Sequence, residues 1–333
     1  MHEHAQLLLS RPCATACGSC QAQVQLVQPL RGTIRFLGED LIGAPYRRLR
    51  DMRGRNVAYI FQDPLATLHP LYSVGDQLIE AFSSHRKIGR HEGRAHAIDL
   101  LKQVRIPNAE KRIDSYPHEL SGGMRQRVGI AMALANDPEV IIADEPTAGL
   151  DVSVQGEILN LMARLQREHE LSYLIITHNL HVVHHVADRT AVMYLGRVVE
   201  SGPKKVLFGN PLHPYTEALL SAVPVPDPVA EQLRQRVILE GDIPSPANPP
   251  GGCPFHTRCP VARDQCSTDV PEGREIESGH GDAALEQGED RRRHVVEPVP
   301  SPRRRRGVAG RRGRLDPPFV SDRRVAHPRD GIP

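Results

Sequence analysis

The feature that most constrains this chain is a short apolar run that ends in two adjacent carboxylates, Val140 to Glu145 (VIIADE). Such a run is typical of a buried strand. A buried strand delivers its last residues rigidly to a site at its carboxyl end, where Asp144 can hold Mg²⁺ through water and Glu145 can polarise an attacking water. Taken alone, the same residues are also typical of a strand followed by a solvated acidic turn.

Further short apolar runs alternate with helical patterns along the middle of the chain. Strands that alternate with helices predict an α/β domain with a largely parallel sheet. The expected strands are 57–61, 140–143 and 174–176, with a hairpin over 192–199, and the expected helices are 124–135, 154–167 and two more between residues 74 and 105.

Composition excludes several classes of protein. A chain with 39% hydrophobic and 25% charged residues can bury a sizeable core, so disorder throughout is excluded. No apolar run approaches the roughly 18 residues that a membrane-spanning helix needs. Leu7, Leu8 and Leu9 are too few for a secretion signal, which needs an apolar stretch of about 7 or more. We therefore expect the chain inside the cell and outside the bilayer.

The basic charge of the chain is concentrated at its carboxyl end. Residues 291–333 hold 13 Arg and 4 acidic residues, whereas the whole chain has a formal net charge of +2. The rest of the chain is therefore net acidic, which argues against a nucleic-acid groove in the body.

A hydroxyl and two glycines open the helix predicted from residue 124. Ser121, Gly122 and Gly123 allow backbone N–H groups and the helix dipole to approach a phosphate closely. A Ser-Gly-Gly turn is also a common helix cap, so this segment alone does not decide between the two roles.

The order of these motifs resembles that of the ATPase subunits of ABC transporters. The resemblance covers roughly residues 32–281. It assigns Gln62 to the Q-loop as a Mg²⁺ and γ-phosphate sensor, Leu120 to Met124 to the signature motif, Asp144 to the Walker B strand as a Mg²⁺ ligand through water, Glu145 to the catalytic base, Asp151 to the D-loop and His178 to the switch histidine.

This resemblance implies a fold, two cofactors and a set of partners. The fold is an α/β, P-loop NTPase-like ABC ATPase core with a helical subdomain and a small loop-rich carboxyl-terminal extension. ATP and Mg²⁺ are bound between two ATPase subunits, each ATP held by one subunit's Walker motifs and by Ser121, Gly122, Gly123 and Asp151 of the other. The pair docks on two membrane permease subunits, served by an extracytoplasmic binding protein, and no nucleic acid is expected.

Finer motifs resemble one branch of that family. Residues 116–119 (YPHE), 211–216 (PLHPYT) and 253–260 (CPFHTRCP) look like dipeptide and oligopeptide importers, and nickel importers share much of this pattern. The branch implies import of peptides from the cytoplasmic face of the cell membrane. The expected division is 1–31 unassigned, 32–208 ATPase domain with a helical subdomain at about 70–135, 209–281 extension and 282–333 disordered Arg/Pro-rich tail.

One motif of the family is missing from the sequence. A P-loop ATPase cradles the β and γ phosphates with G-x-x-x-x-G-K-[ST], and this pattern occurs nowhere in the 333 residues. Two explanations stay open. Residues 1–31 are read from a shifted frame or a wrong start, or the chain is a catalytically degenerate subunit.

Two cysteine triplets suggest metal more than disulfides in a chain expected inside the cell. Cys13, Cys17 and Cys20 have the C-x3-C-x2-C spacing of radical SAM enzymes, a rival class whose remaining motifs are not found; three accidental thiols are the alternative. The other triplet, Cys253, Cys259 and Cys266, resembles the 4Fe-4S site of some peptide-importer ATPases, but no fourth Cys follows Gly279-His280. Three free thiols are the alternative there too.

Overall fold

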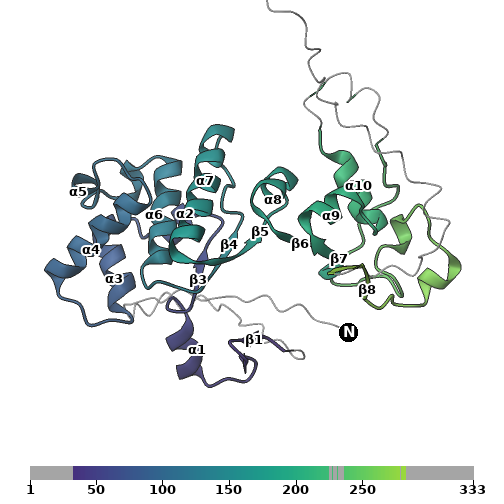
Figure 1. The fold of residues 1–333 in the computed structure, drawn as a ribbon, viewed down its shortest axis with the longest axis horizontal. Helices are drawn as coiled ribbons and strands as arrows, with labels where there is room; N and C mark the ends of the chain where they lie inside the picture. The colour runs from purple at the N-terminus through teal and green to yellow at the C-terminus, as the bar shows by residue number, and fades with distance from the viewer. Residues whose placement is uncertain (1–32, 225–226, 228–230, 232–235, 278, 283–333) are drawn as a thin grey trace, which may run out of the picture. The chain divides into compact units, whose positions relative to one another are not determined.

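A three-stranded parallel sheet organises the first part of the chain (Figure 1). The computed structural model describes residues 33–224, 227, 231, 236–277 and 279–282. The strands of this sheet, in spatial order, are β3 (Val57–Ile60), β4 (Val140–Asp144) and β5 (Ser172–Ile176). Because β4 lies between two parallel neighbours, its carboxyl end opens at the same sheet edge as theirs. The predicted parallel sheet is confirmed.

The strands differ in how deeply they are buried. Ile141 and Ala143 of β4 are fully buried, in keeping with the apolar run. In β5, by contrast, Leu174 and Ile176 are 55% and 48% exposed. The strand predicted at 174–176 is confirmed as part of β5, although Leu174 and Ile176 stay about half-exposed. Among the described elements β5 pairs only with β4, so it is an edge strand. The face of β5 that carries Leu174 and Ile176 is open.

Two long helices pack beside this sheet, and each begins at a capped residue. The predicted helix 124–135 is observed as α6 (Gly122–Leu134), and 154–167 as α7 (Val152–His169). Both helices begin two residues earlier than predicted. Ser121 and Asp151 are their N-caps, and each accepts a hydrogen bond from a backbone N–H of the first turn.

The remaining helices and a short ribbon surround this core. The predicted pair between residues 74 and 105 is observed as two helices with a connection between them. These elements are β1 (Arg35–Phe36), β2 (Glu39–Asp40), α1 (Tyr46–Met52), α2 (Pro64–Thr67), α3 (Val74–Ser83), α4 (Arg90–Gln103), α5 (Ala109–Arg112) and the 3-10 helix Pro117–Glu119.

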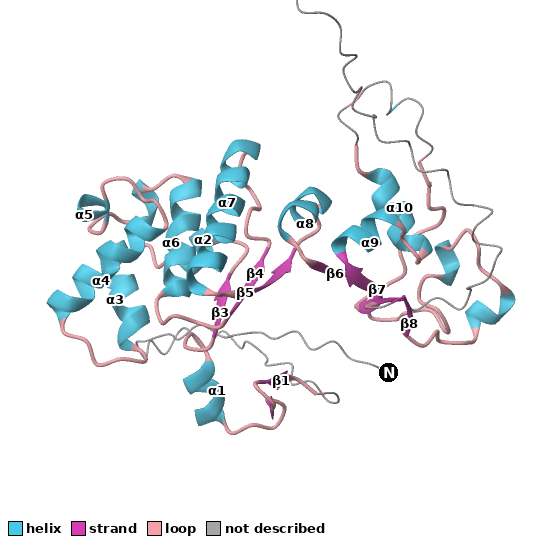
Figure 2. Cartoon of the chain, viewed as in Figure 1, coloured by secondary structure: helices cyan, strands magenta, loops and turns pink. Residues whose placement is uncertain are grey.

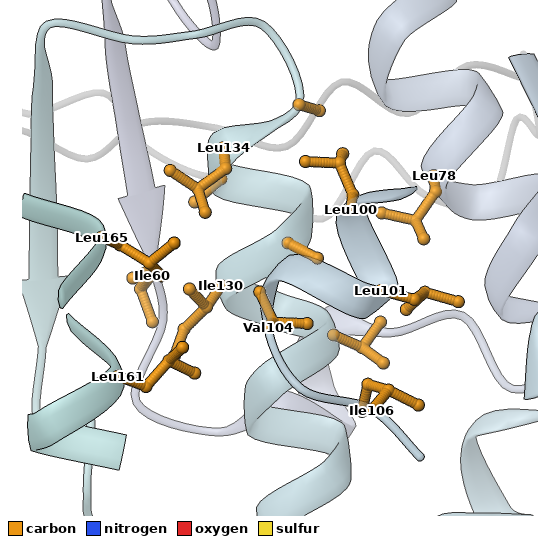
Figure 3. Close-up of a cluster of buried hydrophobic side chains, with 14 of the residues drawn as sticks. Ile60, Leu78, Leu100, Leu101, Val104, Ile106, Ile130, Leu134, Leu161 and Leu165 are labelled. Carbon is orange, nitrogen blue, oxygen red and sulfur yellow. The ribbon is translucent and has the colours of Figure 1, made fainter. Parts of the chain in front are cut away.

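One hydrophobic cluster joins the sheet to the helices around it (Figure 3). Ile60 of β3 meets Ile130 of α6 and Leu165 of α7, while Leu78 and Leu101 bring α3 and α4 into the same cluster. Helices α3 and α4 therefore share a core with the sheet that leads to Asp144 and Glu145. Burial of this apolar area is the main force that holds the site-bearing strands together.

The second part of the fold is an antiparallel sheet in the order β6-β7-β9-β8 (Figure 2). The predicted hairpin 192–199 is confirmed and extends further in both strands, whereas β8 and β9 were not predicted. The elements here are β6 (Arg189–Tyr194), β7 (Arg197–Pro203), β8 (Arg274–Glu277), β9 (His280–Asp282), α8 (Leu180–Val186), α9 (Lys204–Gly209), α10 (Pro214–Ala222) and the 3-10 helices His256–Arg258 and Asp264–Ser267.

A buried carboxylate joins three segments of this second sheet. Glu200 of β7 accepts backbone hydrogen bonds from Leu212 and His213, each at 2.9 Å, just before α10 begins. The same carboxylate lies 2.8 Å from Nε2 of His280 in β9, and both side chains are buried. Because Glu200 bonds both the backbone before α10 and the imidazole of His280, it ties β7, β9 and the start of α10 to one another, while Nδ1 of His280 is buried with no hydrogen-bond partner among the described residues.

In the part of the chain that the structure describes, no helix is both long and apolar enough to cross a membrane. The expectations for residues 1–31, including Cys13, Cys17 and Cys20, lie outside the described residues. So does the tail predicted from residue 282, apart from Asp282 itself.

Stability should depend on β4 far more than on the open face of β5. Ile141→Ala removes a fully buried side chain from the central strand and should cost about 2–5 kcal/mol of unfolding free energy. Leu174→Ala, at a half-exposed position of the next strand, should cost roughly 1 kcal/mol or less. Urea denaturation of both variants measures the difference, and equal losses would contradict the burial pattern.

Candidate functional site

The ends of β4 and β5 place the predicted base and switch histidine side by side. The backbone N–H of Glu145 donates to the carbonyl of Ile176 at 2.8 Å, which continues the sheet pairing past Asp144. Glu145 has a φ of 46°, in the left-handed region that non-glycine residues seldom adopt. Strained backbone of this kind persists where the surrounding structure imposes it, and it often accompanies functional sites.

Three groups hold the Glu145 carboxylate. Oε1 accepts a hydrogen bond from the backbone N–H of His178 at 2.9 Å and lies 2.5 Å from Nδ1 of the same residue. The hydroxyl of Thr177 donates to Oε2 at 3.2 Å. The Glu145 side chain is 14% exposed, whereas that of His178 is 86% exposed. A shielded carboxylate beside an accessible imidazole can orient and deprotonate a water.

Asp144 has a partner that fixes one of its two oxygens. The hydroxyl of Tyr59, in β3, donates to Oδ2 of Asp144 at 2.9 Å. Burial, followed by this hydrogen bond, raises the pKa of Tyr59 to about 12, so the phenol stays a donor at neutral pH. Tyr59 bonds only Oδ2, and Oδ1 of Asp144 has no hydrogen-bond donor among the described residues. A carboxylate oxygen of this kind suits Mg²⁺ or its bound water.

Gln62 follows β3 at the same end of the sheet. Ile60 pairs with Ala143 in register, so the chain beyond both strands emerges at one edge. Gln62 lies two residues past Ile60 and is exposed. The fold thus brings Gln62, Asp144, Glu145 and His178 to the carboxyl edge of one sheet, as the sequence predicted for a site there.

The residues predicted for the signature motif and the D-loop lie at the starts of helices and not beside the Glu145 carboxylate. Ser121 Oγ accepts from the N–H of Met124 at 3.3 Å, and Asp151 Oδ1 accepts from the N–H of Val154 at 3.0 Å. These bonds are helix caps, and within the described residues neither side chain is bonded to Glu145. Ser121 and Asp151 are exposed, with Gly122 and Gly123 just inside the start of α6. The structure therefore does not bring these residues into the Glu145 cluster of the same chain.

The predicted 4Fe-4S cluster at Cys253, Cys259 and Cys266 finds no support in the structure. Among the described residues, no group of three or more His, Cys, Asp or Glu side chains is arranged to hold a metal ion. Cys253 and Cys266 are buried free thiols that pack with Phe255 in an apolar cluster. Burial raises the pKa of the Cys253 thiol, which disfavours the thiolate that a metal ligand requires.

Two residues of the site were missed from the sequence, Tyr59 and Thr177. Thr177 directly precedes His178 at the end of a strand, so its proximity to the site could have been inferred. Tyr59 gave a weaker signal, because it read as one more apolar member of the strand 57–61. Its contact with Asp144 joins residues 85 positions apart and follows from the pairing of β3 with β4.

Comparison with known families gives two matches. The model of the ABC transporter family matches residues 20–148. The model of the oligopeptide/dipeptide transporter C-terminal region matches residues 199–266. Both matches overlap the described fold, the first with the β3–β4 sheet and the second with β7, α9 and α10.

Curated relatives agree with these matches. The chain is 45% identical over 270 residues to the oligopeptide transport ATP-binding protein AppF of Bacillus subtilis, covering 80% of this chain and 81% of that protein. It is 47% identical over 262 residues to a putative peptide import ATP-binding protein of Brucella ovis, covering 79% and 81%. A putative oligopeptide transport ATP-binding protein of Bacillus subtilis, YkfD, is 45% identical over 258 residues, covering 77% of each chain.

The bond between Tyr59 and Asp144 predicts a pH-dependent contribution to stability. Folding raises the pKa of Tyr59 from about 10 to about 12, so folding favours the protonated phenol. The stability that Tyr59 adds over a Tyr59→Phe variant should be fully present below pH about 10 and should fall as pH rises toward about 12. Urea midpoints of both proteins between neutral and alkaline pH measure it. A difference that grows with alkaline pH would contradict the assignment.

Proposed function

Because this chain belongs to the ABC transporter ATP-binding proteins, in their oligopeptide/dipeptide branch, we propose that it is the ATPase subunit that powers peptide import through a membrane complex. The observation that carries this proposal is the Glu145 carboxylate held by Thr177 and His178 at the end of β4. Neither the radical SAM alternative nor the degenerate-subunit alternative gains support from the relatives, which are named as ATP-binding proteins of peptide transport or import and match 77–80% of this chain.

The residues at the sheet edge divide the hydrolysis step between them. ATP supplies the phosphoanhydride bond, and Mg²⁺ neutralises charge on the phosphates when both are bound. Asp144, aligned by Tyr59, would hold Mg²⁺ through water, and Gln62, just past the end of β3, would be a second residue that holds the ion. Glu145 accepts a proton from the attacking water. The exposed imidazole of His178 is placed to orient the γ-phosphate.

The phosphate cradle is the part of the site that this sequence does not supply. The Asp144 and Glu145 side of the site fits Mg-ATP, but no P-loop pattern lies in the 333 residues. Ser121, Gly122 and Gly123 form a capped, exposed helix start that suits a phosphate held by another subunit. ATP hydrolysis therefore belongs to the assembled pair, in which this chain gives its signature turn to the nucleotide of the partner ATPase.

The remaining partners follow from the family. Two permease subunits in the membrane take up the motion of the pair, and an extracytoplasmic binding protein delivers the cargo to them. The chain acts from the cytoplasmic face of the membrane, with residues 32–208 as ATPase domain and 209–281 as extension. A peptide cargo is favoured over nickel because the relatives described above are named for peptide or oligopeptide transport.

Glu145→Gln tests the assignment of the base. The amide cannot accept the proton of water, so ATP turnover at a site that Glu145 serves should fall by about 10² or more, with nucleotide left trapped. Single-turnover hydrolysis by the assembled pair measures the effect. Glu170→Gln is a matched control, because Glu170 also has a positive φ of 53° but is exposed at the end of α7. The test applies to ATP bound at the sheet edge that carries Asp144 and Glu145, and undiminished hydrolysis of ATP bound there would remove Glu145 from the mechanism.

The missing P-loop gives a second prediction. Alone, the 333-residue chain should bind ATP poorly and show negligible ATPase activity, since the P-loop supplies most contacts to the β and γ phosphates. With an intact, non-identical partner, one composite site should hydrolyse ATP. Ser121→Arg should silence that site by blocking approach of the γ-phosphate, while Ser84→Arg, at the exposed end of α3, should not. Micromolar ATP binding with hydrolysis by the isolated chain would refute the argument.

A further inference from the structure

The starts of α6 and α7 lie against each other, and each carries one exposed residue assigned to the nucleotide interface. Ser121 caps α6 and Asp151 caps α7. The two helices run side by side in Figure 1, and Arg127 of α6 bonds Glu157 of α7 at 2.8 Å one to two turns further along. Ser121 and Asp151 thus belong to two neighbouring helix starts.

Gly123 is the point where the two starts meet most closely. A Cβ added at Gly123 would lie 2.7 Å from Cγ1 of Val154, closer than carbon atoms approach without a shift. At Gly122 the nearest atom would be Cδ2 of Leu150, at 3.4 Å, which is ordinary contact. Gly129, further along α6, has no atom within 4 Å of such a Cβ. Among the glycines of α6, only Gly123 therefore has no room for a Cβ atom.

Backbone conformation does not explain the glycine at 123. Gly123 is not among the glycines with positive φ, and it sits in regular helix, where alanine is the better residue. The close contact with the side chain of Val154 is a packing reason for a glycine at this position.

Val154 cannot move aside cheaply. Its own N–H donates to Asp151 Oδ1 at 3.0 Å, and its side chain packs on the main hydrophobic cluster. The next residue, Gln155, donates through Nε2 to the carbonyl of Leu150 at 3.0 Å. These two hydrogen bonds tie the first turn of α7 to Leu150 and Asp151. A shift of the Val154 backbone would therefore also displace the Asp151 cap.

We propose that Val154 is a positioning residue for the signature turn: its side chain fills the space above Gly123 and makes the starts of α6 and α7 one rigid unit. Ser121 and Asp151 are then presented to the nucleotide interface together, and a displacement of either helix start moves both. This inference rests on the proposed function for its catalytic consequence, and on the packing alone for its structural one.

A double-mutant cycle between positions 123 and 154 tests the contact. Gly123→Ala should lower kcat for ATP of the assembled pair by about tenfold or more, because overpacking displaces the signature turn. Val154→Ala removes the side chain that positions the turn and should lower kcat by about threefold, and the Gly123→Ala/Val154→Ala protein should return to about the kcat of Val154→Ala alone, above that of Gly123→Ala, because the clashing Cγ1 is gone. KM for ATP should change less than kcat throughout. Gly129→Ala is the control and should leave turnover unchanged.

Thermal unfolding of the isolated chain gives a readout that needs no activity. Gly123→Ala and Val154→Ala should each lower Tm by several degrees, and the double variant should lose clearly less than the sum. A double variant as inactive as Gly123→Ala, or additive losses of Tm, would overturn the proposal and leave close approach of nucleotide as the reason for the glycine. If the wild-type pair hydrolyses no ATP, the proposed function fails, and the Tm cycle still decides the contact.

Discussion

The site depends on the parallel pairing of β4 with β5, because this pairing sets the position of every group around Glu145. The bond from the Glu145 N–H to the Ile176 carbonyl carries the pairing one residue past Asp144. It holds Glu145 in a left-handed conformation and turns its carboxylate toward Thr177 and His178. A shift of one residue between the strands would move these side chains to the opposite face. The buried Ile141 and Ala143 in turn fix β4 in the core.

The groups assigned to ATP are distributed over two separate features of the chain. One feature is the pair of strand ends, where Glu145 follows Asp144 and contacts His178. The other is the pair of helix starts that are capped by Ser121 and Asp151. Under the proposed function, a second ATPase subunit brings the missing half to each feature. The absence of a P-loop pattern makes the dependence on a partner stronger for this chain than for a subunit that carries one.

Local sequence predicted the parts of this fold that local chemistry decides. The apolar run before Asp144 predicted β4, and the helical spacing of apolar residues predicted α6 and α7 to within two residues at their starts. The bond from Tyr59 to Asp144, the buried pair of Glu200 with His280 and the pairing of β9 with β7 were missed, because each joins segments 80 or more residues apart. The short strand β8, which pairs with the nearby β9, was missed as well. The open face of β5 was missed for a similar reason, since burial depends on neighbouring elements and not on the strand itself. The cysteine spacing suggested a cluster, but no group of three or more side chains is arranged to hold a metal among the described residues.

The central claim is that Glu145 and its neighbours drive a membrane transporter for peptides. The direct measurement is ATP hydrolysis by this chain, assembled in proteoliposomes with an intact partner ATPase, two permease subunits and the peptide-binding protein. Hydrolysis should require the partner ATPase, should rise when the permease subunits and peptide-loaded binding protein are added, and should be accompanied by peptide uptake into the vesicles. Hydrolysis that is indifferent to the membrane subunits and to peptide would contradict the claim.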